Sequence, residues 1–134
     1  MSQLNFHNKS SNIAPPIAVP ALVQKFVAVY KLWQEYRDHF PKKSRFSLGG
    51  KIDSLFIEII ELLFVASYLG KQEKLPYLQK AIRKLDVLKF FFQVSWEIKA
   101  LDNKKYISIS ERLNEIGRML GGWIRGIQSK TPAR

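Results

Sequence analysis

The sequence contains no cysteine, and histidine occurs only at positions 7 and 39. Without cysteine the chain has no disulfide framework and no thiolate metal site, and a reducing compartment is permitted. Neither His7, in the polar start of the chain, nor His39, at a predicted helix end, is placed to activate a serine nucleophile. Glu58 and Glu61 lack the histidine companions of a di-metal helix bundle, and we interpret them as ion-pair residues. We therefore expect no catalytic residues, no metal ligands and no cofactor.

Long hydrophobic runs are also missing. Positions 1–12 are polar, with a single lysine, and lack the apolar segment of a secretory signal. The most apolar stretch, residues 55–69, is interrupted by Glu58 and Glu61, which argues against a membrane span. We expect a soluble cytoplasmic protein that does not act at a membrane.

Acidic residues are scarce relative to basic ones. The chain has 22 lysines and arginines against 11 aspartates and glutamates, a formal net charge of +11. A protein with this balance attracts polyanions at neutral pH, so the expected partner is a nucleic acid or an acidic protein.

The pattern that is present is helical. Apolar residues recur at steps of three and four, which predicts helices over residues 21–40, 45–69 and 73–101, and a last helix after a turn at residues 102–106. The first two stripes are Leu22, Phe26, Val29, Trp33, Tyr36 and Phe40, then Leu48, Ile52, Leu55, Ile59, Leu62 and Ala66. The last two are Leu78, Ile82, Leu85, Leu88, Phe92 and Trp96, then Ile109, Leu113, Ile116, Leu120, Trp123 and Ile127.

Proline, glycine and serine residues mark the predicted ends of these helices. Pro41 should stop the first helix and Ser44 should cap the second, while Gly70 should end the second before a loop at residues 71–74. Ser108 and Glu111 have capping-box spacing. No useful stretch alternates with period two, so we predict an all-α, up-down-up-down four-helix bundle over residues 20–128. We expect a disordered or extended N-terminal tail, residues 1–19, and a C-terminal tail, residues 129–134, to flank it.

The second and third helices carry apolar residues on a second side as well. These residues are Ile57, Phe64 and Tyr68, then Val87, Phe91, Val94, Ile98 and Leu101. One small bundle does not cover two opposite apolar faces, so we predict a subunit interface there. The alternative is that the N-terminal tail covers this surface.

Basic residues cluster, and the clusters form the predicted nucleic-acid contact. They are Lys42, Lys43 and Arg45; Lys80, Arg83 and Lys84; Lys104 and Lys105; and, on the outer side of the last helix, Arg118 and Arg125. The bundle topology should bring the first and third groups to one end. Four glycines in the last helix, Gly117, Gly121, Gly122 and Gly126, suggest close backbone approach. Aromatic residues at helical spacing, Trp96 among them, are interpreted as packing.

Three segments carry a family resemblance: Arg-Phe-Ser-Leu-Gly at residues 45–49, Leu-Lys-Phe-Phe-Phe at 88–92 and Glu-Ile-Gly-Arg-Met-Leu-Gly-Gly-Trp-Ile at 115–124. Together they resemble the accessory variability determinant (Avd) family of diversity-generating retroelements, over about residues 19–130. The resemblance implies a barrel-shaped homopentamer that binds the element's reverse transcriptase and its template RNA, and thereby supports mutagenic cDNA synthesis. It also makes Arg118 and Trp123 members of the family's motif.

Two other interpretations stay open. One is a basic bundle of the same fold that binds only protein and has no retroelement role. The other is a metal- or cofactor-dependent bundle enzyme, which ranks last because the sequence offers no ligand set for it. Salt-dependent RNA binding separates the first interpretation from the retroelement accessory.

Overall fold

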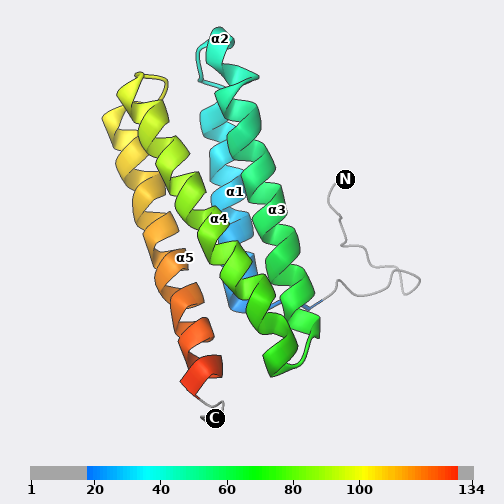
Figure 1. Ribbon diagram of the computed structural model, residues 1–134. Coiled ribbons are helices and arrows are strands. Elements are labelled where there is room, and N and C mark those ends of the chain that lie inside the picture. Colours follow the sequence, from blue (N-terminus) through cyan, green and yellow to red (C-terminus); the bar gives the residue numbers. More distant parts are fainter. Residues whose placement is uncertain (1–17, 130–134) are drawn as a thin grey trace, which may run out of the picture.

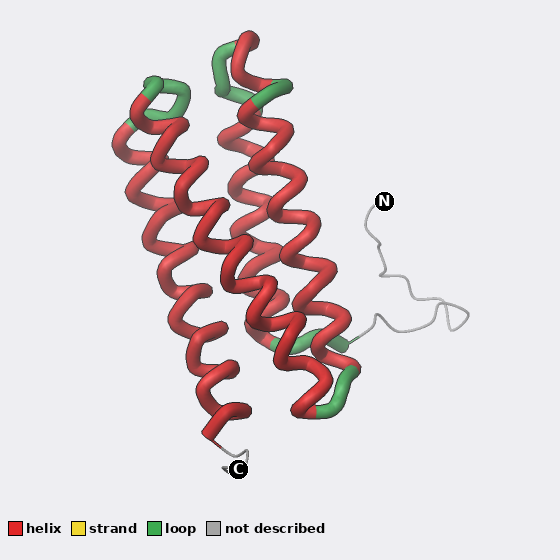
Figure 2. Tube along the Cα trace, viewed as in Figure 1, coloured by secondary structure: helices red, strands yellow, loops and turns green. Residues whose placement is uncertain are grey.

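The computed structural model describes residues 18–129, and every regular element in that range is a helix (Figure 2). Four long helices are α1 (Ala21–Arg37), α3 (Leu48–Tyr68), α4 (Lys71–Glu97) and α5 (Asn103–Ser129), and a single turn, α2 (Lys42–Arg45), lies between α1 and α3. They form an up-down-up-down bundle (Figure 1). The predicted all-α bundle is confirmed. Positions 1–17 and 130–134 of the predicted tails lie outside the described residues.

The centre of the core is a group of aromatic rings from three helices. Trp33 of α1 packs edge-on against Phe92 of α4, with ring centroids 5.4 Å apart, and lies 6.4 Å from Phe56 of α3. Phe26 extends the group at 5.2 Å from Phe56. Phe56 lies outside the predicted stripe of its helix, yet it is fully buried. The fourth helix closes the core with Ile109, Leu113, Ile116, Leu120, Ile124 and Ile127.

The corner between α1 and α3 differs from the prediction. The first helix ends at Arg37, four residues before Pro41, and Pro41 is instead the N-cap of α2. Ser44 lies inside α2, so it is not the cap of the next long helix, which begins at Leu48. Proline suits this position because its fixed φ and missing N–H are compatible with a helix start.

The connection between α3 and α4 is shorter than predicted. Residues 71–74 form the first turn of α4 instead of a loop. Gly70 is the N-cap, and its backbone N–H donates to Glu73 Oε1 at 3.3 Å. A carboxylate in the first turn also interacts favourably with the helix dipole.

The largest departure is at the end of α4, which stops at Glu97 instead of continuing to residue 101. Lys99 has a φ of 65°, in the left-handed region, and turns the chain. Leu101, predicted on the outer face, is therefore only 2% exposed and belongs to the core. Trp96, predicted in the core, is 40% exposed.

The fifth helix begins earlier than the capping-box pattern predicted. It starts at Asn103, and Ser108 lies within it. Asp102 fills the capping role, because its Oδ1 accepts a hydrogen bond from the backbone N–H of Lys105 at 2.8 Å. Across residues 18–129, no helix is long and apolar enough to cross a membrane.

Candidate nucleic-acid interface

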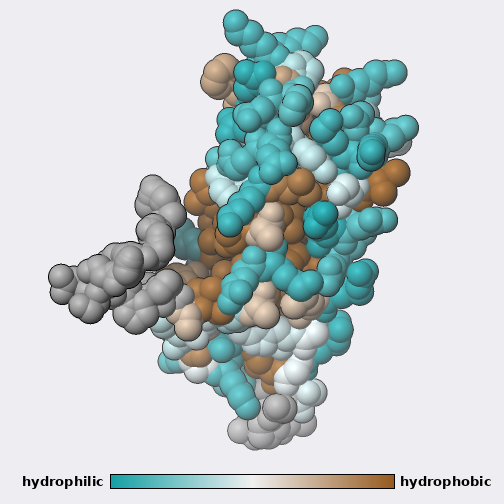
Figure 3. All heavy atoms as spheres, turned by 180° about the vertical axis from the view of Figure 1, so that it is seen from behind, coloured by the Kyte–Doolittle hydropathy of each residue, from teal (hydrophilic) through white to brown (hydrophobic). Residues whose placement is uncertain are grey.

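One end of the bundle carries both α2 and the turn between α4 and α5 (Figure 1). This end, which we call the basic end, brings together Lys42, Lys43, Arg45, Lys104 and Lys105. Seen from behind, hydrophilic side chains cover the same end, whereas hydrophobic residues gather across the middle of the molecule (Figure 3). The bundle topology thus brings the cations of α2 to the same end as those at the start of α5, although the two groups lie about 60 residues apart in the chain.

The lysines at the basic end differ in their availability. Lys42, Lys43 and Lys104 are exposed. Lys105 is half-buried: its Nζ lies 3.2 Å from Asp102 Oδ2 and 5.9 Å from the centre of the Tyr36 ring. The Lys105 backbone N–H and ammonium group lower the pKa of Asp102. Lys105 therefore links α5 to α1 in addition to contributing positive charge.

Arg45 is bound to the backbone of its own corner. Its Nη2 donates to the carbonyl oxygens of Phe40 at 3.1 Å and Asp38 at 3.4 Å. Arg37 Nη2 in turn donates to the Arg45 carbonyl at 3.3 Å. These bonds satisfy carbonyls that follow the end of α1, so the guanidinium of Arg45 mainly stabilises the α1–α2 corner.

The sequence did not single out Lys99, which the structure places at the same end. It is exposed and lies in the turn between α4 and α5. The apolar pattern predicts a helix through residue 101, in which Lys99 would be an ordinary helix residue rather than part of a turn. A terminating signal after Glu97 would have revealed the turn, but no glycine or asparagine marks it.

The second basic group, Lys80, Arg83 and Lys84, lies on α4 beside the acidic residues of α3. Lys84 Nζ forms an ion pair with Glu58 Oε1 at 2.9 Å, and this contact lowers the pKa of Glu58. Lys80 and Lys84 line a groove of about 360 Å³ together with Glu58 and Glu61. Our interpretation of Glu58 as an ion-pair residue is confirmed, and part of this group's charge is neutralised within the bundle.

Arg118 and Arg125 are exposed on α5, as are two of the helix's glycines, Gly122 and Gly126. At Gly117 an added Cβ would lie 3.1 Å from Lys89 Nζ and 3.6 Å from Leu85 Cδ2, so side chains of α4, not its backbone, approach this glycine. At Gly126 an added Cβ would meet no atom within 4 Å, so the predicted close approach is absent there within the described part of the chain.

Trp123, a member of the helix motif, is half-buried rather than fully inside the core. Lys74 Nζ lies 5.2 Å from the centre of its ring, a cation–π contact between α4 and α5. Both residues line a groove of about 270 Å³ at the end of the bundle opposite the basic end, with the two open glycines in its wall.

The residues predicted for the subunit interface lie on α3 and α4, which pack against each other, except Ile98, the C-cap residue directly after α4. Ile57, Tyr68, Val87 and Ile98 are exposed, while Phe64, Phe91 and Val94 are half-buried. Phe64 and Tyr68 pack edge-on at 4.8 Å, and Phe91 packs partly against the core. The structure thus leaves apolar side chains in solvent on both helices.

No group of three or more histidine, aspartate or glutamate side chains within residues 18–129 is arranged to hold a metal ion. Comparison with protein-family models gave a match to the family described as bAvd-like, over residues 21–127. A search of curated protein sequences gave no match. The matched range includes all five helices apart from the last two residues of α5.

Proposed function

The chain belongs to the bAvd-like family, and from that premise we propose that it is a non-enzymatic accessory protein of a diversity-generating retroelement. It binds the element's reverse transcriptase and its template RNA, and it assembles as a homo-oligomer, with five subunits as the resemblance implies. The polymerase partner performs the chemistry of mutagenic cDNA synthesis. This chain supplies a surface that holds the RNA and the enzyme together.

The observation that carries the RNA-binding role is the basic end. Exposed lysines from α2, from the α4–α5 turn and from the start of α5 lie at one end of a protein with a net charge of +11. Each lysine that meets a phosphate releases condensed counterions, so a cluster of them strengthens binding to any nucleic acid at moderate salt. Contacts of this kind position the partner without reading its sequence.

The exposed apolar side chains on α3 and α4 support the assembly. A single bundle gains nothing from keeping Ile57, Val87 and Ile98 in water, whereas a ring of subunits would bury them. Different patches on neighbouring subunits close into a ring when the rotation between them permits it.

The test of RNA binding removes charge from the basic end. Replacing Lys42, Lys43, Lys104 and Lys105 by glutamine should weaken binding of a structured RNA and make its salt dependence shallower. Each lost phosphate contact reduces the magnitude of the slope of log affinity against log salt by about 0.7 to 0.9, so the four changes together reduce it by up to about 3.6. Filter binding or fluorescence anisotropy over a salt series measures both quantities.

A matched control removes the same charge elsewhere. Lys25, Lys31, Lys71 and Arg112 are exposed and lie outside the four basic groups, so replacing them by glutamine should leave the slope nearly unchanged. Equal losses in both variants would mean that net charge, not the basic end, drives binding. Absence of RNA binding by the unmodified protein at low salt would instead favour a bundle that binds only protein.

A further inference from the structure

Trp96 is the residue whose position departs most from its sequence pattern. The spacing of α4 puts it on the core stripe with Phe92, but the helix ends one residue later, at Glu97. Leu101 returns beneath the turn and occupies the core instead. The indole is therefore left 40% exposed beside the basic end.

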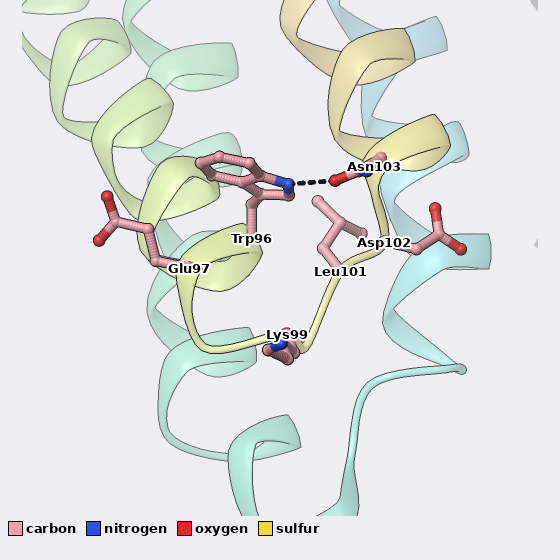
Figure 4. A pocket seen from close by; sticks show the side chains of 6 residues that line it. All are labelled: Trp96, Glu97, Lys99, Leu101, Asp102 and Asn103. Atoms are coloured by element: carbon pink, nitrogen blue, oxygen red, sulfur yellow. Dashed lines mark hydrogen bonds between the residues drawn. The ribbon is translucent and has the colours of Figure 1, made fainter.

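Two contacts from α5 hold this indole in place. Its ring is stacked on Tyr106, with centroids 5.2 Å apart and an interplanar angle of 12°. Its Nε1 donates a hydrogen bond to Asn103 Oδ1 at 2.5 Å (Figure 4). Because Tyr106 is stacked on one face of the indole, a ligand can stack only on the opposite face. A flat apolar surface fixed in this way loses little conformational entropy when it binds a ligand.

The indole forms one wall of a cavity of about 620 Å³ at the α4–α5 turn, within the range of about 300 to 1,000 Å³ typical of ligand sites. The other residues that line it are Glu97, Lys99, Leu101, Asp102 and Asn103. Figure 4 shows the carboxylates of Glu97 and Asp102 directed away from the indole, on opposite sides. Asp102 is also paired with Lys105, which reduces its repulsion of a negatively charged ligand.

We propose that this cavity holds an unpaired nucleobase from a single-stranded stretch of nucleic acid, stacked on the indole of Trp96. Asn103 uses its carbonyl oxygen to fix the indole, so its amide N–H groups remain as donors toward a base edge. Lys99 and Lys104, exposed on the same turn and the first turn of α5, meet the flanking phosphates. Aromatic stacking combined with nearby cations is how proteins hold single strands without strict sequence preference.

The inference rests on the proposed function, because a protein that binds no nucleic acid has no base to stack. The lysines of the basic end bind phosphates of any nucleic acid, whereas the stacking site would make the protein prefer unpaired bases. The cations at this turn favour a nucleic acid over an apolar protein side chain as the occupant.

The experiment compares a single-stranded oligonucleotide with an abasic strand of equal length, which keeps the phosphates and lacks the bases. The unmodified protein should bind the normal strand more tightly by roughly 5- to 150-fold, the equivalent of one stacked base. Trp96→Leu should abolish this preference, while the affinity for the abasic strand and the salt slope stay the same. Trp123→Leu, the same change at the opposite end, should keep the preference.

The outcomes separate this inference from the proposed function. Equal binding of both strands by the unmodified protein would overturn the stacking site and leave the RNA-binding role standing. Binding of neither strand at low salt would overturn both. A preference that survives Trp96→Leu would place the base elsewhere and overturn the assignment to Trp96.

A second measurement uses the unmodified protein, so it does not depend on how a variant folds. A strand containing 5-bromouracil is irradiated in the complex, and the protein is digested with trypsin. We expect the crosslink in the peptide of residues 90–99, released by cleavage after Lys89 and Lys99, with fragmentation placing it at Trp96. A crosslink confined to other peptides would contradict the proposal.

Discussion

Asp102 shows how much a single side chain does at the basic end. Its Oδ1 accepts the backbone N–H of Lys105 at 2.8 Å, and its Oδ2 lies 3.2 Å from the Lys105 ammonium. One residue thus caps α5 and anchors a lysine that also lies over the Tyr36 ring. These contacts favour the ionised carboxylate and lower its pKa.

The lowered pKa predicts how stability changes with pH. A carboxyl whose folded pKa lies below its unfolded value of about 3.9 stabilises the protein above that value, and the contribution is lost as pH falls through the folded pKa. At pH 7, Asp102→Ala should lower the melting temperature, and Asp102→Asn, which keeps a neutral cap acceptor, should lower it less. Thermal melts followed by circular dichroism measure both changes.

Acidification supplies the control for that prediction. The difference in melting temperature between the unmodified protein and Asp102→Asn reports the charge alone, so it should shrink below about pH 4. A difference that stays constant down to low pH would show that the charge of Asp102 does not stabilise the fold.

Trp96 and Leu101 show what periodicity predicts at the residue scale and where it stops. Both residues continue the three- and four-residue steps of α4, so the pattern predicted opposite burial from what is found. The cause is the left-handed conformation of Lys99, a residue type with no strong preference for it. Local propensity therefore could not reveal the turn, and the cavity beside Trp96 was not predictable.

Helices whose apolar residues form one continuous stripe were predicted well. In α1 and α5 the predicted stripe is buried, except that Tyr36 and Trp123 are half-buried. In α3 the apolar residues surround much of the helix, so the pattern did not distinguish fully buried Phe56 from exposed Ile57. The pair between Lys84 and Glu58 depends on the register of α4 against α3, which a single sequence does not specify.

The open glycines of α5 give a prediction at the scale of the helix. An added Cβ at Gly122 would come no closer than 4.0 Å to another group, the guanidinium of Arg125. Gly122→Ala should therefore raise the free energy of unfolding by about 0.5 to 1 kcal/mol, because alanine restricts the unfolded chain and favours the helix. Chemical denaturation measures the change.

Gly117 provides the comparison for that substitution. There the added methyl group would lie 3.1 Å from Lys89 Nζ and 3.6 Å from Leu85 Cδ2, so Gly117→Ala should gain less stability. If Gly122→Ala instead destabilises the isolated protein, the higher helix propensity of alanine does not determine stability at this position. If it stabilises the protein but weakens assembly or RNA binding, the open glycine serves a partner's close approach.

At the scale of the whole molecule, the exposed apolar side chains of α3 and α4 are the surface that we propose another subunit covers. Phe91 packs partly against the core, so a charge at that position would disturb the bundle as well as an interface. Ile98 on the predicted interface and Ile107 outside it are better matched, with exposures of 54% and 55%. A carboxylate introduced at either position is thus about equally exposed in an isolated bundle, although Ile98 is the C-cap of α4 and Ile107 lies within α5.

Ile98→Asp should lower the mass in solution toward that of a single 15.6 kDa chain, because assembly would bury an unpaired carboxylate. Ile107→Asp should leave the assembly intact, and both variants should keep the helical circular dichroism of the unmodified protein. Multi-angle light scattering at several concentrations measures the mass. Equal masses for the two variants, with helical circular dichroism unchanged in both, would contradict the interface on α3 and α4.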